Sequence, residues 1–203
     1  MGDRTTLVLA PARGIGAAVA DRLRARGDRV MTLDPAVDPT DAAAVGAALA
    51  PSVPVDLAVL SWIEPSALVA RDAIAMDEAA WDDACERTIR ASFVLLQQAH
   101  AVVRDGGRVV LVLPTVAATG VAGLVPLCTA VESVRVMAKA VARRWGARAV
   151  TVNTVEVDLE SFVRGDGADA TGSVPHVPVL GQPSLAERDA VADVVGLLDL
   201  LAD

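Results

Sequence analysis

Apolar runs and helical repeats alternate along the whole 203-residue chain. The apolar runs are short and continuous, as in strands buried on both faces. The segments between them space apolar residues three or four apart, which is typical of helices. Strands are expected at 5–10, 28–34, 55–62, 106–114 and 148–157, and helices at 16–27, 38–50, 77–104, 127–146 and 184–202.

This alternation predicts an α/β fold in a single domain that covers 1–203. Strands buried on both faces form parallel sheets with helices on each side. Right-handed crossovers then give a doubly wound, Rossmann-like sheet of about five strands. Because 159–183 is rich in Gly, Pro, Asp and Ser, it is expected to be the one long loop.

Charge and composition narrow the classes of partner. The net charge is -8 and the pI is about 4.7, so an acidic surface would repel phosphate backbones and no nucleic-acid partner is expected. Prolines and glycines interrupt the uncharged run 109–131, which we interpret as a buried strand and an apolar loop rather than a membrane span. Neither a signal-peptide pattern nor metal-like spacing of Cys85 and Cys128 is present, which predicts a cytoplasmic protein with buried thiols.

The first expected strand leads into a helix through a glycine-bearing turn, APARGIG at 10–16. Such a turn lets a pyrophosphate approach the backbone at a helix N-terminus. The surrounding segment, LAPARGIGAAVADRLRARG, resembles the Thr-Gly-x-x-x-Gly-x-Gly pattern of the short-chain dehydrogenase/reductase family. Three later segments resemble that family in the same order: WDDACERTIRASF, GGRVVLV and MAKAVARRWGARAVTVNTV.

The resemblance covers nearly the whole chain and implies a particular sheet. The chain before VDLAVL is too short for the family's third strand, and none follows the final helix. In the family's strand numbering, the expected order is therefore 2-1-4-5-6, without the two edge strands. New sheet edges are exposed in this way, and exposed edges need to be covered or paired.

The resemblance also implies that the family's hydride-transfer chemistry is lost. That chemistry uses an Asn, a Ser, a Tyr and a Lys, and this chain has no Tyr. The corresponding positions hold Thr88, Pro114, Leu127 and Val131. General acid–base catalysis needs a group that can hold a proton, and the side chains of Pro, Leu and Val hold none.

The cofactor motif is only partly retained. Ala10 replaces the family's first Gly, and its methyl group is expected to crowd the turn. Trp62 stands near the expected adenosine path. Asp34 either binds a ribose 2′-hydroxyl, which would favour NAD over NADP, or simply ends a strand. We expect no cofactor, or NAD bound weakly, with the matching residues being Gly14, Ile15, Gly16 and Asp34.

Other candidate residues have weaker support. Glu156, Asp158 and Glu160 follow the fifth strand, where they would form a cation site, act as a base, or be solvated loop charges. A stripe of solvated positive charges is expected on the helix at 127–146, at Arg135, Lys139, Arg143 and Arg144.

Cys128 adjoins the lost Tyr position, where it is either a nucleophile or a structural thiol. No motif ties a histidine to it: His100 is expected at the surface or an interface, and His176 in the long loop. No metal site is predicted.

The leading functional hypothesis is a non-catalytic subunit that forms a homodimer, or a hetero-oligomer with an active paralogue. The resemblance implies pairing through helices 82–104 and 128–145, and the apolar loop 112–127 would be a packing surface. Both helices carry more apolar positions than one buried stripe requires, among them Val94, Leu95, Val131 and Val134. One alternative is a cyclase, isomerase or dehydratase that works without a nicotinamide. Another is a weak NAD-dependent oxidoreductase or nucleotide sensor.

Overall fold

A computed structural model describes residues 4–50, 54–164 and 189–201. They contain one five-stranded sheet in the order β2-β1-β3-β4-β5, and every neighbouring pair is parallel. Since this chain skips the family's third strand, β3, β4 and β5 correspond to the family's fourth, fifth and sixth strands. The order therefore confirms the predicted sheet, including the lack of the two family edge strands among the described residues. The strands are β1 (Thr5–Leu9), β2 (Arg29–Thr32), β3 (Val55–Leu60), β4 (Val103–Pro114) and β5 (Thr151–Val157).

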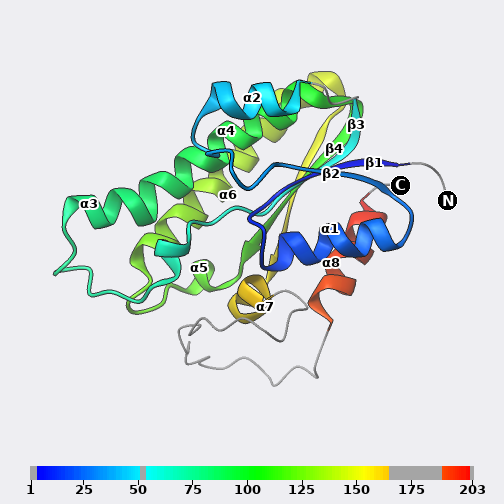
Figure 1. The fold of residues 1–203 in the computed structure, drawn as a ribbon. Helices are drawn as coiled ribbons and strands as arrows, with labels where there is room; N and C mark the ends of the chain where they lie inside the picture. The colour runs from blue at the N-terminus through cyan, green and yellow to red at the C-terminus, as the bar shows by residue number, and fades with distance from the viewer. Residues whose placement is uncertain (1–3, 51–53, 165–188, 202–203) are drawn as a thin grey trace.

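Helices cover both faces of the sheet, as expected for a doubly wound fold (Figure 1). One face carries α1 (Ile15–Ala25) and α8 (Ala190–Leu200), which pack on each other. The other face carries α2 (Ala42–Leu49), α4 (Arg87–Val102) and α6 (Val125–Trp145). Shorter helical segments are 3₁₀ turns at Pro65–Leu68 and Gly146–Arg148, a π-helix at Asp82–Glu86, and α3 (Glu78–Trp81), α5 (Val116–Thr119) and α7 (Leu159–Arg164).

The core lies on both sides of the central strands. Leu7 of β1, Val59 of β3 and Val110 of β4 have no accessible surface. Two layers of helices exclude water from these strands, which explains why their sequences are continuous apolar runs.

Three segments differ from their predicted form. The helix expected to reach 104 ends at Val102, and Val103 already pairs with Val55 as the start of β4. The segment 112–127, expected to be an apolar loop, instead contains the end of β4, then α5 and the first turn of α6. Many of its apolar side chains are buried in the core, which favours regular structure over a loop. The expected loop 159–183 begins with α7, and its remainder lies outside the described residues, as do 184–188.

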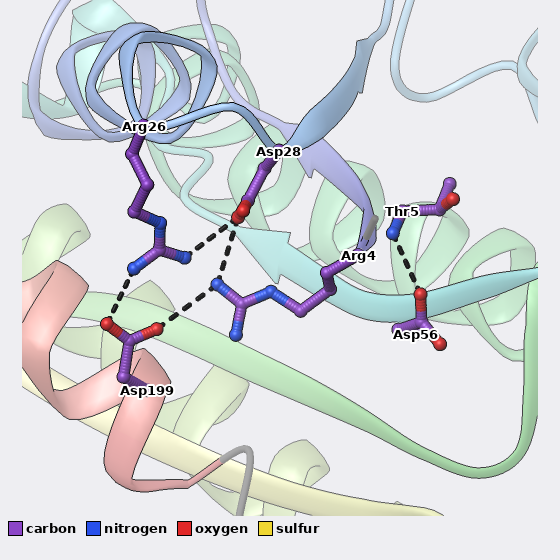
Figure 2. A network of polar contacts seen from close by, with 6 residues as sticks. All are labelled: Arg4, Thr5, Arg26, Asp28, Asp56 and Asp199. Atoms are coloured by element: carbon purple, nitrogen blue, oxygen red, sulfur yellow. Dashed lines mark hydrogen bonds and ion pairs between the residues drawn. The ribbon is translucent and has the colours of Figure 1, made fainter. Parts of the chain in front are cut away.

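A charged cluster fastens α8 to α1 at the amino end of β1 (Figure 2). The Asp28 carboxylate accepts hydrogen bonds from Arg4 at 3.0 Å and from Arg26 at 2.8 Å. The Asp199 carboxylate, in the last turn of α8, accepts from the same two arginines at 3.3 and 2.5 Å. This clamp holds the end of the sheet opposite to the edge at which α/β folds bind ligands.

Candidate functional site

The turn after β1 is closely packed where it enters α1. Gly14 is the N-cap of α1 with a φ of 87°, a left-handed conformation that favours glycine. A Cβ atom at Gly16 would lie 2.4 Å from the Cβ of Ala10 and 3.0 Å from that of Ser61. The Ala10 methyl group therefore packs directly against the first turn of α1.

Helix α7 lies against the other side of this turn (Figure 1). A Cβ atom at Gly14 would lie 2.8 Å from the carbonyl oxygen of Phe162 and 3.4 Å from that of Val163. A dinucleotide pyrophosphate needs open space beside the helix N-terminus and positive potential there. A methyl group and two carbonyl oxygens border the turn, and the space that stays open beside it is a pocket lined by Ala10, Pro11, Ala12 and Gly16.

A pocket of about 230 Å³ opens between α1 and β2. Its apolar walls include Ala10, Pro11, Ala12 and Gly16 of the turn before α1 and its first residues, and Asp21, Arg24 and Thr32 supply the polar side chains. Arg24 donates to the Asp21 carboxylate at 2.8 Å, so its charge is already partly neutralised. Asp34 is not among the lining residues: it is exposed, and its Oδ1 accepts from the backbone N–H of Ala36 at 2.9 Å.

Three of the four positions assigned to family catalysis lie in the apolar core. Pro114, Leu127 and Val131 are buried. The fourth, Thr88, is also fully buried, and its hydroxyl donates to the Ala84 carbonyl and accepts from the Glu64 N–H, both at 3.1 Å. The hydroxyl of Thr88 thus joins α4 to the segment after β3.

A polar bridge joins the segment after β2 to the segment after β3. The Trp62 indole N–H donates to Glu64 at 3.1 Å, and Arg87 pairs with the same carboxylate at 3.3 Å. Arg87 also donates to Asp38 at 3.0 Å. The pKa of Asp38 is lowered, first by the backbone N–H and hydroxyl of Thr40 and less by the Arg87 charge. No sequence pattern predicts this bridge, because no spacing links residues that only the fold brings together.

The three acids that follow or end β5 all have structural partners. Glu156 forms an ion pair with Arg135 of α6. Asp158 accepts from the backbone N–H of Ser161 at 2.8 Å and from its hydroxyl at 2.6 Å, which caps the first turn of α7. Glu160 pairs with Arg164 one helical turn later, at 3.0 Å. No group of three potential metal ligands occurs in the described part of the chain.

The prediction of a stripe of solvated positive charges is wrong for Arg135. Arg135 is largely buried, and it pairs with Glu132 at 3.0 Å as well as with Glu156. Lys139, Arg143 and Arg144 are exposed as expected.

The two cysteines have different surroundings. Cys85 is fully buried, and burial, with a smaller effect of the Glu86 charge, raises its pKa to about 11. Cys128 is only half-buried, with its Sγ 3.9 Å from the Val116 carbonyl oxygen. The prediction of buried thiols therefore holds for Cys85 alone.

His100 is a packing residue. Its ring lies 4.7 Å from that of Trp145, measured between centroids. Its pKa is lowered, first by burial and then by the Arg148 charge, against a smaller opposite effect of Asp105. His176 lies outside the described residues.

Helices α4 and α6 pack on each other and keep large apolar side chains exposed, one on α4 and two on α6. The residues first taken as surplus, Val94, Leu95, Val131 and Val134, are buried in the core of this chain. The exposed apolar side chains are instead Phe93 of α4, which is 51% exposed, and Val136 and Val125 of α6, which are 62% and 40% exposed. Among the described helices, none combines the length and apolarity that crossing a bilayer requires.

No protein-family model matches the chain, and no curated protein matches its sequence. Solved structures do resemble it. A dehydrogenase/reductase from Sinorhizobium meliloti is 21% identical with a TM-score of 0.75, over 100% of this chain and 88% of that one. A short-chain dehydrogenase/reductase from Serratia marcescens is 20% identical with a TM-score of 0.74, over 98% and 88%. A blue fluorescent protein from a metagenomic library, in complex with NADPH, is 25% identical with a TM-score of 0.70, over 98% and 90%.

Proposed function

Because this chain has the fold of the short-chain dehydrogenases/reductases, we propose that it is a non-catalytic subunit that pairs with itself or with an active paralogue. One observation carries the proposal. The positions expected to hold the catalytic Ser, Tyr and Lys are Pro114, Leu127 and Val131, all buried. A group that neither ionises nor reaches solvent cannot transfer a proton to a substrate.

Weak or absent cofactor binding follows from the turn before α1. The metagenomic blue fluorescent protein is in complex with NADPH. In this chain, the Ala10 methyl group and the α7 carbonyl oxygens border the turn that would receive the pyrophosphate. Losing several backbone hydrogen bonds of about 1 kcal/mol each weakens binding by orders of magnitude, so we expect NAD or NADP to bind at millimolar concentrations or not at all.

The outer faces of α4 and α6 supply the pairing surface. Phe93 and Val136 are exposed on α4 and α6, two helices that pack on each other. Exposed apolar patches on globular proteins commonly mark interfaces, and each such side chain contributes about 1.5–3 kcal/mol when buried. A two-fold contact would bury both side chains of each subunit at once.

The oligomeric state tests the proposal. Light scattering at micromolar concentration should show a dimer of the wild-type chain, or a stable complex with a co-expressed active short-chain dehydrogenase/reductase from the same genome. The double variant Phe93→Asp/Val136→Asp should abolish this pairing without changing the melting temperature. Ile74→Asp is the matched control, because Ile74 is almost fully exposed but lies outside both helices. A wild-type monomer that binds no such paralogue would refute the pairing.

Enzyme assays test the lack of catalysis separately. The purified chain should neither oxidise alcohols nor reduce ketones with NAD(H) or NADP(H). Turnover at an ordinary enzymatic rate that is lost on mutation of the turn at Ala10 or Gly16 would refute this part of the proposal.

The pocket between α1 and β2 favours a second candidate, a small-ligand sensor. Its volume of about 230 Å³ is below the range of about 300–1,000 Å³ that is typical of ligand pockets, so it would admit only a small ligand or part of a larger one. Calorimetry with NADH and smaller adenine compounds distinguishes the candidates, because micromolar binding would favour the sensor.

A further inference from the structure

Strand β5 is one of the two outer strands of the sheet, and β2 is the other. Among the described residues, no strand pairs with the side of β5 that faces away from β4. The Val157 carbonyl oxygen accepts a hydrogen bond at 2.8 Å from the N–H of Thr115, the residue that follows β4. Because the direction of the backbone groups alternates along a strand, the N–H and C=O groups of Val152, Thr154 and Glu156 point to the open side.

The open side of β5 lacks the usual protection of a sheet edge. Proteins commonly keep an outer strand short, place Lys or Pro on it, or bend it with a β-bulge. The other outer strand, β2, has only four residues, and Pro35 follows shortly after it. Strand β5 has seven residues, TVNTVEV, with neither Lys nor Pro and with no shift in its register with β4. Its backbone groups are therefore free to pair with another strand.

An exposed apolar side chain borders this edge. Helix α8 contacts both β5 and α1, and α1 packs on β1 and β2. Asp199 lies on the flank of α8 that faces α1, where it pairs with Arg26. At about 100° per residue, Leu197 lies roughly 200° around the helix from Asp199, on the flank that points toward β5. The Leu197 side chain is 41% exposed there.

We propose that two copies of this chain associate by antiparallel pairing of their β5 strands about a two-fold axis at Thr154. Thr154 then lies opposite Thr154 of the second copy and Glu156 lies opposite Val152, so no like charges face each other across the strands. The axis is perpendicular to the sheet, so both α8 helices stay on one face and their Leu197 flanks turn toward each other. A lone peptide strand would leave Leu197 uncovered, which favours a second copy as the partner.

This contact is separate from the pairing through α4 and α6, and it is the weaker of the two. One strand and one apolar side chain from each copy make a small interface, and interfaces below about 1,200 Å² are typical of weak association. We therefore expect a dissociation constant of about 0.1 mM. The pairing through α4 and α6 is tested at micromolar concentration, where the β5 contact is largely dissociated, so the failure of one does not decide the other.

Sedimentation equilibrium between about 10 µM and 1 mM tests the contact in the Phe93→Asp/Val136→Asp background, which removes the α4–α6 pairing. The chain should pass from monomer to dimer and stop there, because a two-fold contact closes on itself. Adding Thr154→Pro removes one outward N–H and leaves the hydrogen bonds to β4 intact, so this variant should stay monomeric. Thr154→Val is the matched control, because it keeps the N–H and should still dimerise.

A monomer throughout this range, a dimer that persists in Thr154→Pro, or growth beyond a dimer would each overturn the proposal. Hydrogen exchange gives a second readout that needs no substitution in β5, should Thr154→Pro fail to fold. With a dissociation constant of about 0.1 mM, about a fifth of the chains are monomers at about 1 mM and most are at about 10 µM. The amides of Val152, Thr154 and Glu156 should therefore exchange about fourfold more slowly at the higher concentration, and equal rates would contradict the pairing.

Discussion

The charged clamp of Figure 2 allows two carboxylates with the same partners to be compared. Asp28 and Asp199 each bond both Arg4 and Arg26, but the Asp28 side chain is 9% exposed and that of Asp199 is 44% exposed. Asn has nearly the shape of Asp and lacks the charge. Replacing either aspartate therefore removes the ionic attraction and little packing.

The burial difference predicts the order of the two effects. Removing one partner of a fully buried ion pair costs about 3–5 kcal/mol, whereas exposed pairs contribute about 0–1 kcal/mol. The cluster is partly solvated, so we expect Asp28→Asn to lower the free energy of unfolding by about 2 kcal/mol. For Asp199→Asn we expect about 0.5–1 kcal/mol. The first value is a large fraction of a typical domain stability of about 5–15 kcal/mol.

Urea denaturation followed by circular dichroism measures these values, because urea is uncharged and leaves the ion pairs unscreened. The double variant completes a thermodynamic cycle, and coupling between the two aspartates should appear as non-additivity. If Asp199→Asn costs as much as Asp28→Asn or more, burial does not set the strength of this clamp and the reasoning fails.

Three further predictions concern groups that are buried or partly buried. In native protein at pH 8, a thiol reagent should label Cys128 quickly and leave Cys85 unlabelled, because burial raises the Cys85 pKa to about 11; rapid labelling of both would contradict this. The His100 pKa lies below its ordinary 6.5 in the folded chain, so the free energy of unfolding should fall as the pH drops below that value. Urea midpoints measured across this pH range should fall less in His100→Gln, and an unchanged pH profile would argue against this reasoning. Thr88→Val leaves the Glu64 N–H without its partner and should cost about 1–3 kcal/mol in thermal melts. Thr88→Ser keeps the hydroxyl and should lose less, and equal losses would count against the hydrogen bond.

The sheet could be predicted from the sequence because its strands are buried on both faces. The predicted ends of helices and strands were wrong where a helical pattern continues directly into a strand pattern. Val102 ends α4 and Val103 begins β4, and with no turn residue between them the apolar pattern does not separate helix from strand. Helix α7 was hidden for a different reason: Asp158 and Ser161 form a capping pair, but they precede a Gly- and Pro-rich stretch that dominates the composition.

For the site, the sequence revealed which residue types stand at each position but not what they touch. The bridge from Glu64 through Arg87 to Asp38 joins three separate segments and leaves no local pattern. The prediction that additional apolar residues of α4 face another subunit was wrong for Val94 and Leu95 for a related reason. This helix packs at once on the sheet, α2 and α6, so it buries a wider stripe than a helix with one neighbour, and Val94 and Leu95 belong to that stripe.

The packing of α8 on α1 has a consequence for synthesis on the ribosome. The face of α1 that α8 covers is complete once Ala25 is made, whereas the clamp needs Asp199. At about 5–20 residues per second, this apolar face waits about 10 to 35 seconds for its cover. Nascent or truncated chains without α8 should therefore be the ones that chaperones bind and that aggregate.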